Sequence, residues 1–207
     1  MTASFFPSAR RAVLLFAALA LAACMSSGTS YTAPIAAGTS QGWALRDVVV
    51  TVPGTLEVSE SKSIFPKADI VWREDLPGDR RAQVADLLDT AATAGAKRLQ
   101  GTRPVILRLT VSRFHALTLE AERVLSFSGV HDVEFTAEVR DARSGALLAG
   151  PEHIEASIPA MSGEQMIRAR IAGQSQRSQI SAQVTKVIAG WLGLGPDPRG
   201  EFRRLGG

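Results

Sequence analysis

The run Phe127-Ser128-Gly129-Val130-His131-Asp132-Val133-Glu134-Phe135-Thr136-Ala137-Glu138-Val139-Arg140 decides the fold. Apolar side chains alternate with charged and hydroxyl side chains along most of it. This period of two is typical of a strand with one buried face and one solvated face. Such strands belong to antiparallel sheets, so the run predicts a half-exposed antiparallel sheet.

Further strands are predicted on both sides of this run. Residues 104–119 alternate in the same way. Residues 145–158 return after a turn at 141–145, where Gly145 supplies a positive φ. Gly150 and Pro151 interrupt the returning strand and indicate a bulge or an edge position. An earlier strand is predicted at residues 44–52 and a short one at residues 68–72.

Two helices complete the predicted domain. Asp79 is suited to cap a helix that runs to about Leu99. A second helix is expected from about Glu164 to Leu192, with either a kink at its polar segment 173–176 or two packing surfaces. The expected order is β-(β)-α-β-β-β-α. The sequence therefore predicts an α+β fold, with an antiparallel sheet of about four strands and two helices packed on one face.

The N-terminal residues follow the order of an export signal. Arg10 and Arg11 precede an uncharged apolar stretch of about ten residues, which is shorter than the roughly 20 residues that span a bilayer. Leu21-Ala22-Ala23 and then Cys24, the single cysteine of the chain, follow. This arrangement resembles the lipobox of bacterial lipoproteins. The alternative interpretation is an ordinary signal peptide with a chance cysteine, or a buried helix.

The lipobox resemblance implies an anchor and a location. Signal cleavage would fall between Ala23 and Cys24, and Cys24 would carry fatty-acyl chains such as palmitate. In Gram-negative lipoproteins an aspartate after the cysteine usually means retention in the inner membrane. Met25 stands there instead, so the resemblance implies the periplasmic face of the outer membrane, although the choice between the two membranes stays open.

Four segments are expected along the chain. They are a signal peptide at 1–23, a flexible tether at 24–42, a single α+β domain at 43–195 and a disordered tail at 196–207. The tether prediction rests on its serine, threonine, glycine and alanine content. The net charge is only +3, and Arg10 and Arg11 leave with the signal peptide. A nucleic-acid partner is therefore not expected.

The search for chemistry points away from an enzyme. The sequence has no His-Glu-x-x-His, no P-loop and no Gly-x-Gly-x-x-Gly pattern. The histidines His115, His131 and His153 fall on three predicted strands. With suitable turns they would lie within about 8 Å of one another, where imidazoles can hold zinc or sense pH. Core or rim histidines are the favoured interpretation, because His131 is in phase with Val133 and Phe135. No metal and no cofactor are expected.

Three tryptophans are candidates for contact with a partner. Trp43, Trp72 and Trp191 lie at the ends of predicted elements, and tryptophan is frequent at interface hot spots. Packing at the rim of the domain is the alternative.

A wider resemblance covers residues 44–192. The lipobox, the run from Trp72 to Pro77 and a hairpin with Asp141, Ser144, Gly145 and Leu148 resemble small envelope lipoproteins. The comparable groups are the auxiliary lipoproteins of ABC-type lipid transport systems and uncharacterised lipoprotein families. The resemblance implies a lipid-anchored, non-enzymatic accessory or adaptor subunit of a cell-envelope complex, with a protein partner in the envelope. The alternative is a small-ligand or lipid carrier that uses a groove between the sheet and the helices.

Overall fold

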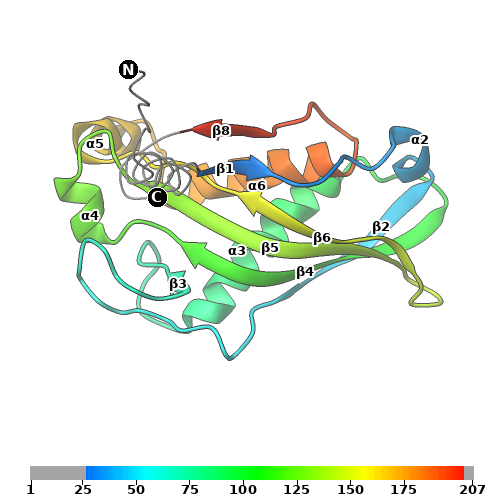
Figure 1. Cartoon of the computed structure of the whole chain (residues 1–207), viewed down its shortest axis with the longest axis horizontal. Helices are drawn as coiled ribbons and strands as arrows, with labels where there is room; N and C mark the ends of the chain where they lie inside the picture. The colour runs from blue at the N-terminus through cyan, green and yellow to red at the C-terminus, as the bar shows by residue number, and fades with distance from the viewer. Residues whose placement is uncertain (1–26, 203–207) are drawn as a thin grey trace, which may run out of the picture.

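The computed structural model describes residues 27–202 (Figure 1). Its strands are β1 (Ser27–Ser30), β2 (Trp43–Thr51), β3 (Ile70–Val71), β4 (Arg103–His115), β5 (Val130–Asp141), β6 (Leu147–Ala156), β7 (Ile158–Pro159) and β8 (Gly200–Phe202). Its helices are α2 (Ala37–Ser40), α3 (Arg80–Ala96), α4 (Leu119–Val124), α5 (Gly163–Ile171) and α6 (Gln176–Trp191).

The sheet is mixed and has eight strands. Six of them follow the order β2-β4-β5-β6-β1-β8, while β3 pairs with β4 and β7 pairs with β5. β2 and β3 run parallel to β4, and the remaining pairs are antiparallel. The expected antiparallel sheet of about four strands with two helices is therefore wrong. The physical reason is that α3 lies between β2 and β4 in the chain, and such a crossover makes two strands parallel.

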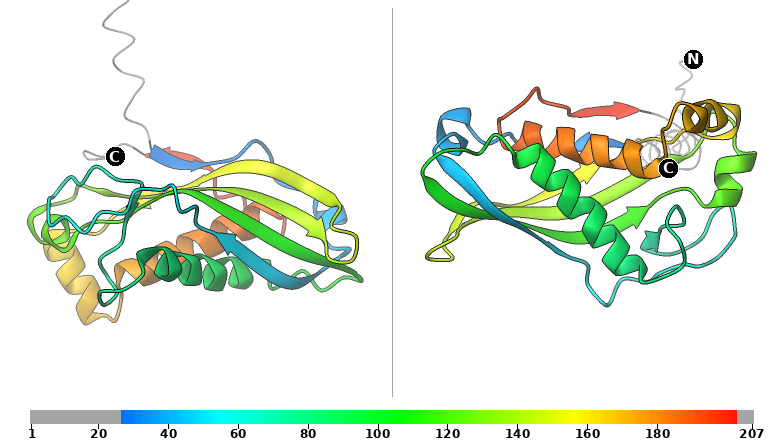
Figure 2. Two further views of the ribbon diagram at one scale, coloured as in Figure 1. Left: turned by 90° about the horizontal axis from the view of Figure 1, so that it is seen from below. Right: turned by 180° about the vertical axis from the view of Figure 1, so that it is seen from behind.

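The two longest helices cover one face of the sheet. Figure 2 shows α3 and α6 side by side on that face. Asp79 begins α3 by accepting hydrogen bonds from the backbone N–H groups of Arg81 and Ala82. Ser175 and Ser178 form a reciprocal capping box at the start of α6. The kink expected at 173–176 is a complete break that separates α5 from α6.

The space between the helices and the sheet is filled with side chains. Leu107 and Leu109 of β4 and Phe135 of β5 meet Leu87 and Leu88 of α3 in one continuous core cluster. Gly95 lets the helices approach closely, because a Cβ atom there would lie 2.6 Å from the backbone oxygen of Thr185 in α6. Between residues 27 and 202, no helix combines the length and the apolarity needed to cross a membrane.

The structure corrects the expected tether over residues 27–42. Residues Thr29 and Ser30 of β1 pair with Ala156 and Glu155 of β6. The ring of Tyr31 is buried in the core cluster, and Ile35 N–H donates to the Trp191 carbonyl at 2.7 Å. The apolar content of this segment is low, so its order comes from pairing with distant strands rather than from a local period. Residues 24–26 lie outside the described part of the chain.

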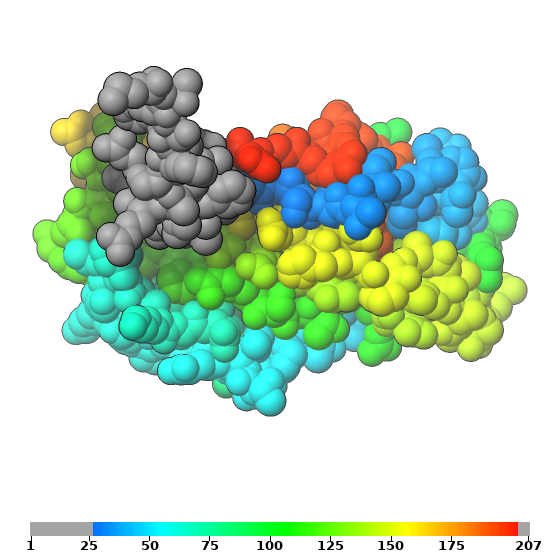
Figure 3. All heavy atoms as spheres, viewed as in Figure 1, coloured from blue at the N-terminus to red at the C-terminus, as the bar shows by residue number. Residues whose placement is uncertain are grey.

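The expected disordered tail is corrected in the same way. β8 pairs with β1 and forms one edge of the sheet. Figure 3 shows the segments of β6, β1 and β8 side by side, in yellow, blue and red. Just before β8, Asp197 accepts a hydrogen bond from the Tyr31 hydroxyl at 2.9 Å. The C-terminal segment as far as Phe202 is therefore part of the domain, while residues 203–207 are not described.

Candidate functional site

Three adjoining hollows lie at the end of the molecule that carries α4 and α5. Their volumes are about 420, 270 and 220 Å³, and Leu119 lines all of them. The largest opens between the loop before α3 and the two short helices. Its lining residues are Arg73, Glu74, Asp75, Leu76, Pro77, Arg80, Leu119, Glu122 and Arg170. The surroundings are therefore rich in arginine and carboxylate groups with an apolar rim.

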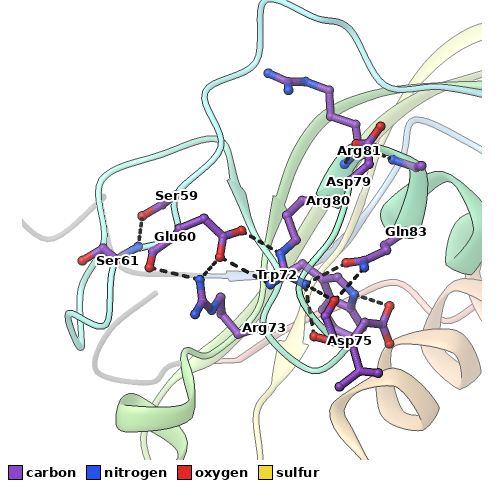
Figure 4. Close-up of polar contacts among 12 residues, drawn as sticks. Ser59, Glu60, Ser61, Trp72, Arg73, Asp75, Asp79, Arg80, Arg81 and Gln83 are labelled. Carbon is purple, nitrogen blue, oxygen red and sulfur yellow. Dashed lines mark hydrogen bonds and ion pairs between the residues drawn. The ribbon is translucent and has the colours of Figure 1, made fainter.

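Arg80 links several side chains along the inner wall of the largest hollow through hydrogen bonds (Figure 4). It is the first residue of α3, and its guanidinium group is buried. Nε donates to Glu60 Oε1 at 2.7 Å, and Nη1 donates to Gln83 Oε1 at 2.8 Å. Arg73 also binds the Glu60 carboxylate. The hydrogen bond from Arg80 lowers the pKa of Glu60 below its ordinary value, against a smaller effect of burial.

Trp72 forms a second polar junction in the same loop (Figure 4). Its indole Nε1 donates to Asp75 Oδ2 at 2.7 Å, and Arg177 of α6 pairs with the same carboxylate. Burial raises the pKa of Asp75, but the hydrogen bonds from Arg177 and Trp72 outweigh it, and the net shift is downward. The Trp72 ring packs edge-on against Phe114, with the ring centres 5.5 Å apart.

Arg170 of α5 joins three separate segments. It binds both carboxylate oxygens of Glu74 at 3.0 and 2.8 Å, and both of Glu122 in α4 at 2.8 and 2.9 Å. These hydrogen bonds raise the pKa of Arg170 further above its already high value. The carboxylates beside the largest hollow are thus neutralised by fixed arginines. Such an arrangement suits a rigid brace between α4, α5 and the loop.

The structure does not bring the three histidines together. His115 lies opposite Asp132 and His153 lies opposite Thr136. A bulge between Val111 and Arg113 shifts the register of β4 against β5, which breaks the alignment expected from turn positions alone. Within residues 27–202, no group of three or more histidine, cysteine, aspartate or glutamate side chains is placed to hold a metal ion.

Each histidine has its own surroundings. His115 Nε2 lies 3.1 Å from the Pro66 carbonyl oxygen, and its partial burial lowers its pKa. His153 is half-exposed and lies 3.7 Å from Glu134. His131 is fully buried, and neither of its ring nitrogens has a hydrogen-bond partner among the described residues. Burial lowers the pKa of His131 to about 3, although the neighbouring Gln179 side chain favours the charged form.

The three tryptophans do not form a contact surface. Trp43, Trp72 and Trp191 are all buried in the main core cluster. Their positions at element ends fit the alternative, packing that closes the domain. The expectation that they contact a partner is corrected, because no ring offers a face to another molecule.

A short serine motif lies between β1 and β2. Gly38-Thr39-Ser40-Gln41-Gly42 has the letters of a Gly-x-Ser-x-Gly nucleophile elbow. An elbow places its serine on an exposed turn between a strand and a helix. Ser40 instead lies buried at the end of the four-residue helix α2, and its hydroxyl donates to the Ala37 carbonyl at 3.3 Å. The motif has no nucleophile geometry here.

Sequence analysis also missed a set of exposed apolar side chains around the hollows. Phe127 is the first residue of the run predicted to form a strand, but β5 begins only at Val130, and Phe127 is 72% exposed in the preceding loop. Its φ of 53° is left-handed, which costs a bulky residue about 1–2 kcal/mol. On α5, Ile167 and Ile171 are also exposed. In the sequence, the exposure of this pair is indicated by its helical phase, because Ile167 and Ile171 do not lie on the same face as the apolar residues of α6.

The predicted lipidation and cleavage residues, Cys24 and Ala23, lie outside the described residues. Their chemistry stays a prediction from the sequence. What the structure adds is the position of the first described residue, Ser27, which pairs with Phe202 of β8.

Solved structures give distant matches. The chain is similar to a dodecamer of a single-substitution variant of PelC from Paraburkholderia phytofirmans, at 14% identity and a TM-score of 0.36, over 80% of this chain and 95% of that one. It is also similar to a candidate lipoprotein from Caulobacter crescentus CB15, at 20% identity and a TM-score of 0.34, over 53% of this chain and 83% of that one. No curated protein matches the chain. A family match covers residues 43–207, and the chain belongs to this family of unknown function, DUF6778.

Proposed function

We propose that this protein is a lipid-anchored lipoprotein of the bacterial cell envelope that acts as a non-enzymatic accessory or adaptor subunit. Acyl chains on Cys24 hold it at the membrane, on the periplasmic face of the outer membrane because Met25 follows the cysteine. Two or more acyl chains make such an anchor stable, since a single chain binds only marginally. The partner is another protein of the envelope.

The observation that carries the adaptor role is the contrast between a filled interior and an open surface. The side chains between the sheet and the helices form one packed cluster. The polar side chains at the largest hollow bind one another through Arg80, Arg170 and Arg177. A domain of this kind works through its outer surface.

The sheet edge at β2 is the docking surface that we favour. β2 ends the order of strands, and residues 47–51 pair along one side only, with residues 106–110 of β4. An open strand edge offers backbone donors and acceptors to an added strand. Arg46 and Asp47 are exposed there, and charged residues on an edge limit unspecific pairing.

The anchor is tested by replacing the cysteine. Wild-type protein should incorporate a labelled palmitate analogue and sediment with membranes, while Cys24→Ser should do neither. An unlabelled wild-type protein would contradict the anchor.

The adaptor role needs a second experiment. A photoreactive residue at Arg46 on the β2 edge is compared with one at Arg143, in the turn between β5 and β6. In intact cells, the Arg46 position should give one discrete protein adduct that the Arg143 position does not give. Adducts with lipid only, or the same adducts from both positions, would refute docking through this edge.

The carrier alternative receives no support from the described residues. It requires an open groove between the sheet and the helices, where Leu107, Phe135 and Ile188 are packed together. The hollows described above lie at the α4 and α5 end instead.

A further inference from the structure

Exposed large apolar side chains gather at one end of the molecule. Within the described residues, eight such side chains are exposed, and all but Leu147 belong to this end. Leu119 and Val124 lie on α4, Ile167 and Ile171 on α5, and Phe127 in the loop between α4 and β5. We call these five residues the apolar end. They project from the side of the molecule where Figure 1 shows α4 and α5.

Two further residues extend the apolar end. The first is Leu76, which lines the largest hollow together with Leu119. The second is Phe65, whose neighbour Ile64 packs against Leu117 and against Ala121 of α4. Leu147 lies at the opposite end of the long axis, at the hairpin between β5 and β6 (Figure 1). Scattered apolar residues on a surface need no explanation, but a gathered and polar-rimmed set marks a contact site.

Phe127 indicates that this exposure is not accidental. Its ring is 72% exposed while its backbone holds a left-handed φ of 53°. The left-handed backbone thus carries a large aromatic side chain that is mostly exposed. Strain of this kind at an exposed residue is a feature of binding sites.

The chain enters the domain at the same end. Ser157 N–H donates to the Gly28 carbonyl at 3.0 Å, and β7, which begins at the next residue, pairs with Val130 and His131 at the start of β5. Phe127 lies just before this strand and Gly163 of α5 follows β7 closely. The beginning of β1 is therefore beside the apolar end.

The distance from the predicted anchor to this point is short. Cys24 precedes Ser27 by three residues, and three residues reach at most about 10–11 Å when fully extended. This limit holds for any conformation of residues 24–26. Acyl chains on Cys24 thus bring the bilayer surface close to the beginning of β1.

We propose that the apolar end is a membrane-contact face, which rests against the lipid bilayer that holds the acylated Cys24. Its side chains enter the interfacial layer, with Phe127, Ile167 and Ile171 foremost. Charge supports a lipid surface as the occupant: Phe202 pairs with Ser27, and the next two residues of the chain are Arg203 and Arg204. Basic residues beside a bilayer are attracted to anionic headgroups. This inference rests on the proposed function, because it takes Cys24 as acylated.

The orientation has a consequence for the rest of the molecule. With the apolar end on the bilayer, the hairpin between β5 and β6 points away from the membrane. The β2 edge then runs along the side of the domain, where it is open to a partner. A flexible tether would leave the orientation free, whereas β1 begins three residues after Cys24 and fixes it.

The test uses the acylated full-length mature protein in vesicles of phosphatidylethanolamine and phosphatidylglycerol. Cys24 is the only cysteine, so a cysteine introduced elsewhere is the only free thiol once Cys24 is acylated. An environment-sensitive fluorophore is attached to Phe127→Cys, to Ile171→Cys and to the control Leu147→Cys, which is also exposed and apolar. All three sites are on the surface, and thermal melting verifies that the labelled proteins fold.

We expect the labels at the apolar end and the control label to respond in opposite ways to a lipid-borne and to an aqueous quencher. Labels at 127 and 171 should be quenched several-fold more strongly by a lipid-borne quencher than the label at 147, and several-fold less strongly by an aqueous one. Equal quenching at 127 and 147 in membrane-bound protein would overturn the membrane-contact face while leaving the anchor intact. Shielding at 127 that occurs in native membranes but not in pure lipid vesicles would also overturn it, in favour of a protein occupant. Failure of the wild-type protein to bind membranes would refute the proposed function itself.

Discussion

The guanidinium carbon of Arg177 lies 5.6 Å from the centre of the Trp72 ring. Both side chains bind the Asp75 carboxylate between them. The contact joins the start of α6 to the loop that leads into α3, and it is a link between two parts of the chain that no local sequence pattern connects.

Replacing Arg177 tests this link. Arg177→Ala removes a half-buried ion pair and a cation–π contact, and it leaves Asp75 with the Trp72 donor. We expect a loss of about 1–2 kcal/mol in the free energy of unfolding, measured by urea denaturation. The matched control is Arg168→Ala, whose partner Glu164 is exposed, as Arg168 itself is. This control should cost at most about 0.5 kcal/mol. Equal losses in the two variants would contradict the account.

His131 should make the protein sensitive to mild acid. Its pKa is about 3 in the folded state, against an ordinary value of 6.5. Between these values the unfolded chain binds a proton that the folded chain does not, so stability falls as the pH decreases from about 6.5 towards 3. The slope contributed by one such group is about 1.4 kcal/mol per pH unit. In His131→Leu the dependence of unfolding free energy on pH should lose this contribution. An unchanged slope in the variant would show that the imidazole charges while buried.

Gly95 should tolerate no side chain. Glycine to alanine inside a helix usually stabilises by about 0.5–1 kcal/mol. At Gly95 the added Cβ would meet the Thr185 backbone oxygen at 2.6 Å and the Ile188 Cβ at 2.9 Å. We expect Gly95→Ala to be destabilising by about 1–3 kcal/mol through overpacking. Gly38 of α2 is the control, because a Cβ there meets nothing within 4 Å. Gly38→Ala should leave the thermal midpoint unchanged or raise it.

The single tyrosine reports on the C-terminal segment. Burial of Tyr31, its hydrogen bond to Asp197 and the nearby charge of that carboxylate raise the pKa of the phenol above its usual value of 10. Since Tyr31 is the only tyrosine, ultraviolet difference spectroscopy follows it without interference. The phenol should stay protonated in the folded protein at a pH where free tyrosine ionises. Asp197→Asn should lower the pKa, and a titration identical to the wild type would show that the Asp197 contact is not formed.

Parts of the fold with a local apolar period could be predicted from the sequence. The cores of β4 and β5 and the capped start of α3 follow from side-chain alternation and from Asp79. β1 and β8 could not be predicted, because they consist largely of serine, glycine, threonine and glutamate and form only by pairing with each other and with β6. The parallel pairing of β2 with β4 depends on the path of the chain through α3 rather than on either strand's own sequence.

The candidate site was less accessible to sequence reasoning than the fold. The bulge between Val111 and Arg113 shifts one strand against the next, and it moved His115 away from the predicted partner. The run of alternating residues that predicts the strand begins at Phe127, whereas β5 itself begins at Val130. Positions of this kind depend on where an element starts, and element boundaries are the least certain part of any pattern-based prediction.

The pairing of β1 with β8 can form only after the whole chain as far as β8 has been synthesised. Synthesis proceeds from the N-terminus, so residues 27–30 exist long before residues 200–202 can lie beside them. Until then β1 can pair only with β6, and the backbone N–H and C=O groups on its other edge have no strand partner. A product that stops before Gly200 would keep this edge permanently open, and we expect it to associate with other copies of itself.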